Sequence, residues 1–231
     1  LLVLGVVAAT SAQATEDPFP DAKALVKQWD VEWTVEPYAQ RSVVKVSQDI
    51  LVRDPLGTEA SNQLIVYYAT KTELAKFDAK TIHADGQVVA VPSSLRLDRP
   101  YYKAGSTEYR ATQFTCPDVQ PGSVLHYEYE LRVAEGVFRM PVEGGWWELQ
   151  GDLPVLSAKL TVRVKDDRWE WQPHTATIVP FDSWCNAGDI KDSGHFSYQI
   201  SCRDVPAFES EPMAPPDNDL RARVFIYAWP T

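Results

Sequence analysis

The chain is poor in the residues from which most enzyme sites are built. Its 231 residues include only three cysteines and four histidines. No Cys-x-x-Cys pair occurs, so the common redox motif and the zinc knuckle are excluded. The glycine-rich phosphate loop, the dinucleotide-binding motif and the calcium loop are also absent. We therefore expect no catalytic residue, no metal site and no cofactor in this chain.

Clusters of basic side chains are missing as well. Lysine and arginine number 22 against 32 aspartate and glutamate residues, and the formal net charge is −10. Nucleic-acid phosphates and anionic membrane surfaces both attract clustered basic residues, so neither is an expected partner. The excess negative charge mainly favours solubility.

The longest apolar run lies at the N-terminus and is short. It covers residues 1–9 and leads to Ala12-Gln13-Ala14, a small-x-small pattern typical of a signal-peptidase cut. A membrane-spanning helix needs ~20 residues, so no span is expected in the mature chain. Residues 1–14 are therefore predicted to be part of a signal peptide, and the protein to be periplasmic or secreted. The alternative is a buried N-terminal strand.

Prolines gather near the C-terminus, in a segment that we interpret as a spacer over residues 206–220. Proline fixes φ and donates no backbone hydrogen bond, so the segment cannot continue a sheet. Residues 15–205 are then a β-domain, and residues 221–231 a last strand leading to a missing domain. The sequence leaves open whether residues 15–205 form one lobe or two.

Apolar and polar side chains alternate with period two along most of the domain, which is typical of strands with one buried face. The predicted strands lie near residues 31–35, 44–52, 124–133, 159–165 and 196–202. Residues 64–68 are apolar on both faces and predict a central strand. Turn residues separate these runs at Asp54–Gly57, Asp85-Gly86, Pro121-Gly122 and Asp192–Gly194.

Helix is expected in only two short places. Asp21 could cap a helical stripe of Ala22, Leu25, Val26 and Trp29, and residues 70–80 could form another turn or two. The predicted fold class is therefore all-β, an antiparallel two-sheet β-sandwich or roll with little helix.

The cysteines offer a disulfide rather than a nucleophile. Cys185 and Cys202 flank a predicted hairpin and could bond, but their spacing is not symmetric about the turn, so the sequence leaves the pairing open. Cys202 alternates with apolar residues, which predicts a buried thiol. Cys116 precedes Pro117 in a loop. None has an expected base or helix N-terminus to lower its pKa.

Histidine and tryptophan supply the remaining candidate sites. His126, Glu128 and Glu130 share a strand face and could bind a metal, but only with a cross-strand partner, so a solvated polar face is expected. His83 is predicted to lie exposed at a hairpin tip. Trp146 and Trp147 are candidate ligand-stacking residues for a sugar, with core packing as the alternative.

Four segments together resemble a bacterial exported domain that precedes transglutaminase-like, papain-fold domains. They are Phe77-Asp-Ala-Lys-Thr-Ile-His-Ala-Asp-Gly86-Gln-Val, the run from Phe114 through Pro121-Gly122-Ser-Val-Leu-His-Tyr-Glu-Tyr, Trp147-Glu-Leu-Gln-Gly-Asp-Leu-Pro154-Val, and Val205-Pro-Ala-Phe-Glu-Ser-Glu211-Pro with Pro215-Pro216. The resemblance spans residues 29–227. In that family the Cys-His-Asp machinery belongs to the following domain, so no catalytic residue carries over to this chain.

The resemblance implies a non-catalytic β-sandwich module that packs beside, or presents substrate to, a downstream transglutaminase-like domain of the same polypeptide. The alternative hypothesis is a carbohydrate-binding module that uses Trp146 or Trp147.

Overall fold

The computed structural model describes most of the domain predicted from the sequence. The described residues are 17–36, 41–69, 72–105, 107–133, 146–165, 184–189, 196–209, 221 and 223–225. They form strands joined by short turns, with one short α-helix and one 3-10 turn, so the all-β prediction is confirmed. None of the described helices is long and apolar enough to cross a bilayer.

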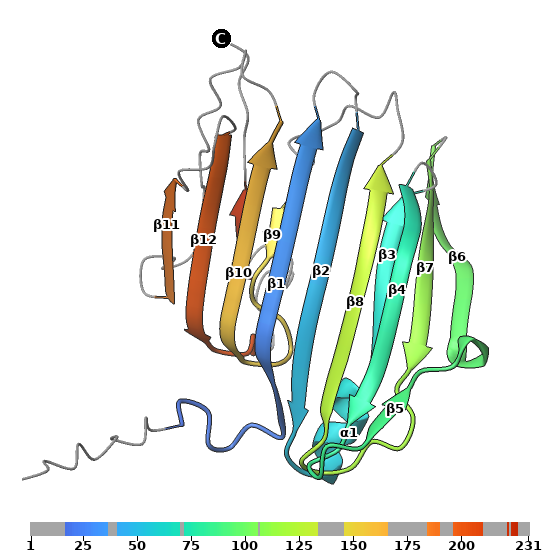
Figure 1. Cartoon of the computed structure of the whole chain (residues 1–231), viewed down its shortest axis with the longest axis vertical. Coiled ribbons are helices and arrows are strands. Elements are labelled where there is room, and N and C mark those ends of the chain that lie inside the picture. Colours follow the sequence, from blue (N-terminus) through green and yellow to red (C-terminus); the bar gives the residue numbers. More distant parts are fainter. Residues whose placement is uncertain are drawn as a thin grey trace, which may run out of the picture.

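Eight strands form one large sheet in the order β11-β12-β10-β1-β2-β8-β4-β5 (Figure 1). Their bounds are β1 Ala24–Glu36, β2 Arg41–Val52, β4 Thr72–Ile82, β5 Val88–Ala90, β8 Val124–Val133, β10 Val155–Val164, β11 Cys185–Asp189 and β12 Phe196–Val205. Every neighbouring pair is antiparallel except β1 and β10, which run parallel. The N-terminal strand β1 therefore joins the two halves of the sheet.

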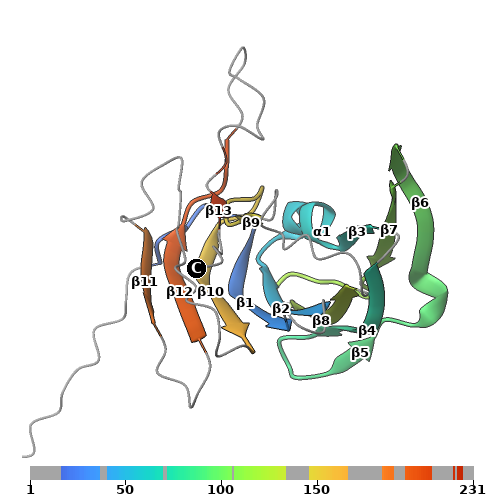
Figure 2. The ribbon, with the colours of Figure 1, turned by 90° about the horizontal axis from the view of Figure 1, so that it is seen from above.

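The other elements lie on one side of the large sheet, as seen from above in Figure 2. A three-stranded sheet has the order β3-β7-β6, with bounds β3 Gln63–Ala69, β6 Arg96–Ala104 and β7 Thr107–Thr115. A two-stranded sheet pairs β9 (Trp146–Glu148) with β13 (Arg223–Phe225). Helix α1 (Pro55–Ser61) links β2 to β3, and a 3-10 turn (Ser93–Leu95) precedes β6.

The core lies between the large sheet and this covering layer. The alternating apolar residues predicted from the sequence face it, including Val31, Trp33 and Leu125. Phe114 of β7 has no exposed surface and meets Phe77 of the large sheet edge-on, with ring centroids 4.3 Å apart. Because an aromatic ring buries a large apolar area, this packing contact is one of the main contacts that hold the two layers together.

Both predicted helices are wrong, and the reason is the same in each place. Residues 24–36 and 72–82 are the strands β1 and β4. β1 has a register shift between Val26 and Gln28, and β4 has one between Leu74 and Lys76. A bulge inserts one residue and breaks the period of two, so apolar residues on either side of it mimic a helical stripe.

The helix that does form begins where the sequence predicted a turn. Asp54 caps it, because its carboxylate accepts a hydrogen bond from the Gly57 N–H at 3.0 Å, and Pro55 begins the first turn. The turns at Gly86 and Gly122 are confirmed, with φ of 88° and 89° respectively. The turn predicted at Asp192–Gly194 lies outside the described residues.

β3 is confirmed as a strand but not as a central one, because it lies at the edge of the three-stranded sheet. Its apolar character has a local cause. Val66 is part of the core, and Leu64 and Tyr68 pack against it from the same face.

Candidate functional site

The outward side of the large sheet carries a groove of about 840 Å³. This polar face is the side turned away from the core, and β10, β1, β2, β8 and β4 all contribute side chains to the groove. The charged lining residues are Asp30, Glu32, Lys45, Lys76, Asp78, Glu128, Glu130, Lys159 and Arg163. The volume lies in the range typical of ligand sites, although this lining is far more charged than most.

Strand register arranges these charges in cross-strand rows. One row runs Lys159, Asp30, Ser47, Glu128 and Asp78 across the five strands. The next row runs Thr161, Glu32, Lys45, Glu130 and Lys76. Residues directly opposite each other on neighbouring strands have side chains in contact range, so the register brings Lys159 next to Asp30 and Lys76 next to Glu130.

Ion pairs hold both flanks of the groove. On the β10–β1 flank, the Lys159 Nζ lies 3.3 Å from Asp30, and the Arg163 Nε lies 2.9 Å from Glu32. These carboxylates are therefore already matched by cations of the neighbouring strand. Exposed pairs of this kind contribute little stability each, but they fix the positions of the charged groups.

The β8–β4 flank is organised around Glu130. The Arg132 Nη2 lies 2.7 Å from this carboxylate and the Lys76 Nζ lies 3.5 Å from it, and the Glu130 side chain is only 8% exposed. The hydrogen bond from Arg132, with the charge of Lys76, holds the pKa of Glu130 below its ordinary value. Glu130 is therefore a fixed anion, and the expectation of a solvated face is wrong for this residue.

Lys45 differs from the other charged lining residues. It lies in the middle of its row with Glu32 and Glu130 on either side, and its side chain is exposed. Among the described residues, Lys45 forms no ion pair. An ammonium group at the centre of the groove is thus available to an anionic group of a ligand.

His126 does not form a metal site with its strand neighbours. Its Nδ1 lies 2.7 Å from an Asp49 carboxylate oxygen, and its Nε2 lies 3.4 Å from Glu128. Glu128 is exposed, as the sequence predicted. Within the described parts of the chain, no group of three or more histidine, cysteine, aspartate or glutamate side chains has metal-binding geometry.

His83 is not exposed, contrary to the prediction. Its side chain is only 8% exposed, and its Nε2 lies 3.2 Å from Asp118 at an angle that is not that of a hydrogen bond. Its Nδ1 lies 3.4 Å from the Ser123 hydroxyl. The turn that precedes β8 folds over the imidazole, a long-range contact that the local turn pattern does not reveal. His174 and His195 lie outside the described residues.

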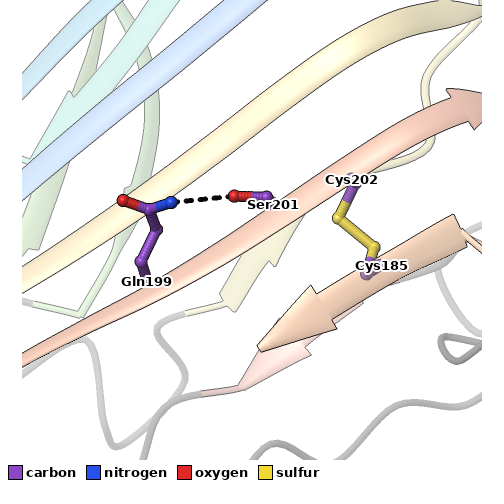
Figure 3. The surroundings of a disulfide bond; sticks show 4 residues. All are labelled: Cys185, Gln199, Ser201 and Cys202. Carbon is purple, nitrogen blue, oxygen red and sulfur yellow. Dashed lines mark hydrogen bonds between the residues drawn. A yellow bond between two sulfur atoms is a disulfide. The ribbon is translucent and has the colours of Figure 1, made fainter. Parts of the chain in front are cut away.

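Cys185 and Cys202 form a disulfide between β11 and β12 (Figure 3). The register pairs these two residues directly, so the expected asymmetry about the turn is wrong. The prediction of a buried thiol at Cys202 is also wrong, although its side chain is buried. The bond attaches β11, the edge strand of the large sheet, to its neighbour.

Cys116 is the free cysteine of the described residues. Burial raises the pKa of its thiol to about 11. A thiol with this pKa is almost entirely protonated near pH 7, and the thiolate is the reactive form. Its surroundings therefore do not activate it as a nucleophile.

The two tryptophans proposed as stacking residues lie on β9. The Trp147 ring packs edge-on against Trp29, with centroids 5.4 Å apart, and belongs to the set packed on the core. The side chain of Trp146 lies outside the described residues. Next to this pair, Arg221 bonds both Glu148 and Asp152, which attaches the segment before β13 to the β9 region.

Comparison with known proteins agrees with this class of two-layer β-protein. The chain belongs to the DUF3857 family, described as a domain of unknown function with a solved structure, which matches residues 39–209. No curated protein matches the chain.

Solved structures that match the chain include two longer proteins. The first is titled a "putative protease" from Parabacteroides distasonis, with a TM-score of 0.73, 14% identity, and coverage of 90% of this chain and 41% of that one. The second is Legionella pneumophila aminopeptidase A in complex with aspartic acid, with a TM-score of 0.38, 9% identity, and coverage of 88% and 21%. This chain thus spans less than half the length of either protein. At this identity, the first likeness shows a shared fold.

The groove was missed by sequence reasoning, although part of its signal was present. Charged residues and threonines alternate with apolar residues from Asp30 in β1 and from Lys159 in β10, which places them on one face. The parallel pairing of β1 with β10 joins segments that are more than a hundred residues apart, and no local pattern predicts it.

Proposed function

We propose that this chain is a non-catalytic module of a longer exported protein, and that it holds a polypeptide substrate for a companion transglutaminase-like or protease-like domain. The observation that carries the proposal is the groove. Its charged residues are fixed by ion pairs, Lys45 alone among the cations lining it has no such pair within the described residues, and no thiol or metal cluster lines it.

Length supports the idea of a companion. The first similar structure aligns with 90% of this chain but only 41% of the longer protein. The resemblance to exported domains that precede papain-fold domains gives the companion its class. The disulfide supports export, because such bonds persist in oxidising compartments such as the periplasm.

The geometry suits holding rather than reacting. A general base or nucleophile needs a perturbed pKa near the working pH and a reacting partner within hydrogen-bond reach. The carboxylate of Glu130 is held as an anion by Arg132, and the thiol of Cys116 is held as a neutral group by burial. An extended peptide lying in the groove would instead place an acidic side chain against Lys45.

Two assays on the purified chain test the proposal. Casein hydrolysis and glutamine–amine exchange should both stay at the background of a Cys116→Ser control. Turnover by the chain that disappears in the Cys116→Ser variant would refute the non-catalytic assignment. Binding of acidic peptides, followed by calorimetry, should weaken in a Lys45→Glu variant and stay unchanged in a Lys103→Glu variant, whose exposed side chain lies on β6.

The second candidate function is carbohydrate binding through Trp146. The packing of Trp147 against Trp29 leaves Trp146 as the tryptophan of this pair to test. Glycan-array binding that is lost in Trp146→Ala would favour this candidate over peptide holding, whereas an array without binding would remove it.

A further inference from the structure

The outer face of the three-stranded sheet collects exposed apolar side chains in an unusual way. Among the described residues, the large hydrophobic side chains that are exposed are Leu56, Val88, Leu95, Leu97, Tyr101, Tyr102 and Tyr109. Four of these seven lie on β6 or β7. Because isolated exposed apolar residues are normal but clusters mark interaction sites, this concentration is informative.

Contacts on the inner side show which side chains face outward. On β6, Arg96 lies over the Phe77 ring at 5.5 Å, and Asp98 accepts a hydrogen bond from the buried Thr112. These contacts place Arg96 and Asp98 on the side of the sheet that carries Thr112 and faces Phe77, so by alternation Leu97 and Arg99 lie on the other side. A register shift between Pro100 and Tyr102 inserts one residue, after which Tyr102 pairs with Tyr109.

Leu97, Arg99, Tyr102 and Tyr109 therefore form one surface, here termed the tyrosine face. The two tyrosine rings lie with centroids 6.3 Å apart and planes 31° apart, and they are 62% and 39% exposed. Two neighbouring rings with accessible faces make a platform on which sugar rings can stack.

Arg99 supplies the charge of this surface. It is exposed, and among the described residues it forms no ion pair. The inward-facing Arg96 is paired with Asp98 at 3.3 Å, and Arg110 lies 3.7 Å from Glu108. A guanidinium can bind a carboxylate through two parallel hydrogen bonds, so Arg99 fits a ligand that carries carboxylate groups.

The strands favour a sugar chain over a peptide. Extended peptides gain most of their affinity from main-chain hydrogen bonds to a free sheet edge. β7 is the middle strand, so its backbone is paired on both sides. The free edge of β6 is interrupted by Pro100, which has no N–H, and by the register shift next to it. The tyrosine ring faces and the Arg99 guanidinium are therefore the groups that remain to recognise a ligand.

The tyrosine face combines two adjacent aromatic rings with a guanidinium that forms no ion pair among the described residues. We propose that the tyrosine face binds an acidic polysaccharide, with Tyr102 and Tyr109 stacking on sugar rings and Arg99 binding a ring carboxylate. This proposal does not depend on the proposed function, because it concerns a different sheet.

Calorimetry with oligogalacturonate, a chain of sugar rings with a carboxylate on each, tests the proposal. Saturable binding is expected that weakens as salt is raised from 0.05 to 0.5 M, about as screening of one charged contact requires. Arg99→Ala should weaken binding about tenfold, the effect of losing one charge-assisted pair. Tyr102→Ala should weaken it severalfold.

Matched controls separate this site from the rest of the molecule. Lys27→Ala removes an exposed cation of β1, on the other sheet and outside the groove, and should leave the affinity unchanged, as should Leu56→Ala on α1. The methyl-esterified oligosaccharide, which keeps the rings and loses the charge, should bind at least tenfold more weakly. Unfolding midpoints of all variants should match the parent, which shows that lost binding is not lost folding.

Three results would overturn the proposal. The first is the absence of saturable binding to oligogalacturonate. The second is affinity that survives both Arg99→Ala and Tyr102→Ala. The third is tighter binding of poly-glutamate than of oligogalacturonate with the same sensitivity to both variants, which would identify an acidic polypeptide as the ligand.

Discussion

The polar face of the large sheet and the tyrosine face of the three-stranded sheet are both exposed, but they differ in whether their charged side chains form ion pairs. In the groove, the carboxylates of Asp30, Glu32 and Glu130 are each matched by a cation of the same or a neighbouring strand. On the tyrosine face, Arg99 has no carboxylate partner among the described residues and lies beside exposed rings.

The difference separates charges that shape a surface from charges that can recognise a ligand. A paired charge is neutralised within the protein and keeps its neighbours in place. An unpaired one offers its full interaction energy to something outside. By this criterion, Lys45 and Arg99 are the two charged residues on these surfaces that are assigned to ligand binding.

The largest effect on the free energy of unfolding is expected at the packing contact between the two sheets. Phe114→Ala removes a side chain with no exposed surface and leaves a cavity between Phe77 and Tyr127, which should lower the free energy of unfolding by about 3–5 kcal/mol. Urea denaturation measures it. Tyr109→Ala, on the opposite face of the same strand, is the control and should change stability by less than about 1 kcal/mol. Equal losses would show that the tyrosine face is structural.

The disulfide is expected to make the next largest contribution to the free energy of unfolding. Replacing both Cys185 and Cys202 with serine should lower the free energy of unfolding by about 3 kcal/mol, because the closed loop between positions 17 apart restricts the unfolded chain. Denaturation of the parent protein under reducing conditions should give the same loss. A double variant as stable as the oxidised parent would contradict the pairing.

Alkaline pH should test the buried tyrosines under the groove. Burial raises the pKa of Tyr129 to about 12 and that of Tyr127 well above its ordinary value. An unfolded tyrosine titrates near pH 10. The folded state therefore holds more protons above about pH 10, so the contribution of these tyrosines to stability is constant below that pH and falls as pH rises towards 12. A phenolate titration at 295 nm should show a late, unfolding-coupled phase that shrinks in Tyr129→Phe.

The smallest effect on the free energy of unfolding is expected from Glu130 and Glu128, two carboxylates on the same strand, β8. Glu130→Gln should cost about 1–2 kcal/mol, because it leaves Arg132 and Lys76 without their shared anion in a largely covered site. Glu128→Gln, at an exposed position, should cost less than about 0.5 kcal/mol. The Glu130 contribution should also disappear with acidification: its folded-state pKa is lowered, so its stabilisation is present above about pH 4.5 and is lost as pH falls below that value. Equal losses of unfolding free energy in the two variants would contradict the prediction that Glu130 contributes more stability than Glu128.

Local patterns in the sequence were sufficient for the fold class and for most strands. Alternation identified β2, β8 and β12 because one face of each packs on the core. It identified residues 31–35 of β1 but failed in the first part of that strand and at β4, where a bulge changes the phase, and at α1, where the cap of a short helix resembles a turn. Each failure has its cause within the mispredicted segment itself. Both bulges lie within five residues of a residue that lines the groove.

The candidate surfaces were harder to predict because they depend on which strands are neighbours. Lys45 is recognisable as special only once Glu32 and Glu130 are known to flank it, and these come from strands separated by about a hundred residues. Arg99 and Tyr102 share a face only because of the register shift at Pro100. Tertiary pairing, which sequence periodicity does not encode, creates both sites.

The most direct test of the central claim uses a longer protein in which this module is joined to the companion domain that we propose. Steady-state kinetics with a peptide substrate should show that Lys45→Glu raises KM severalfold and leaves kcat unchanged, because the residue binds substrate and takes no part in the chemistry. A loss of kcat to background at unchanged KM would contradict the account, since it would place a catalytic group within this module.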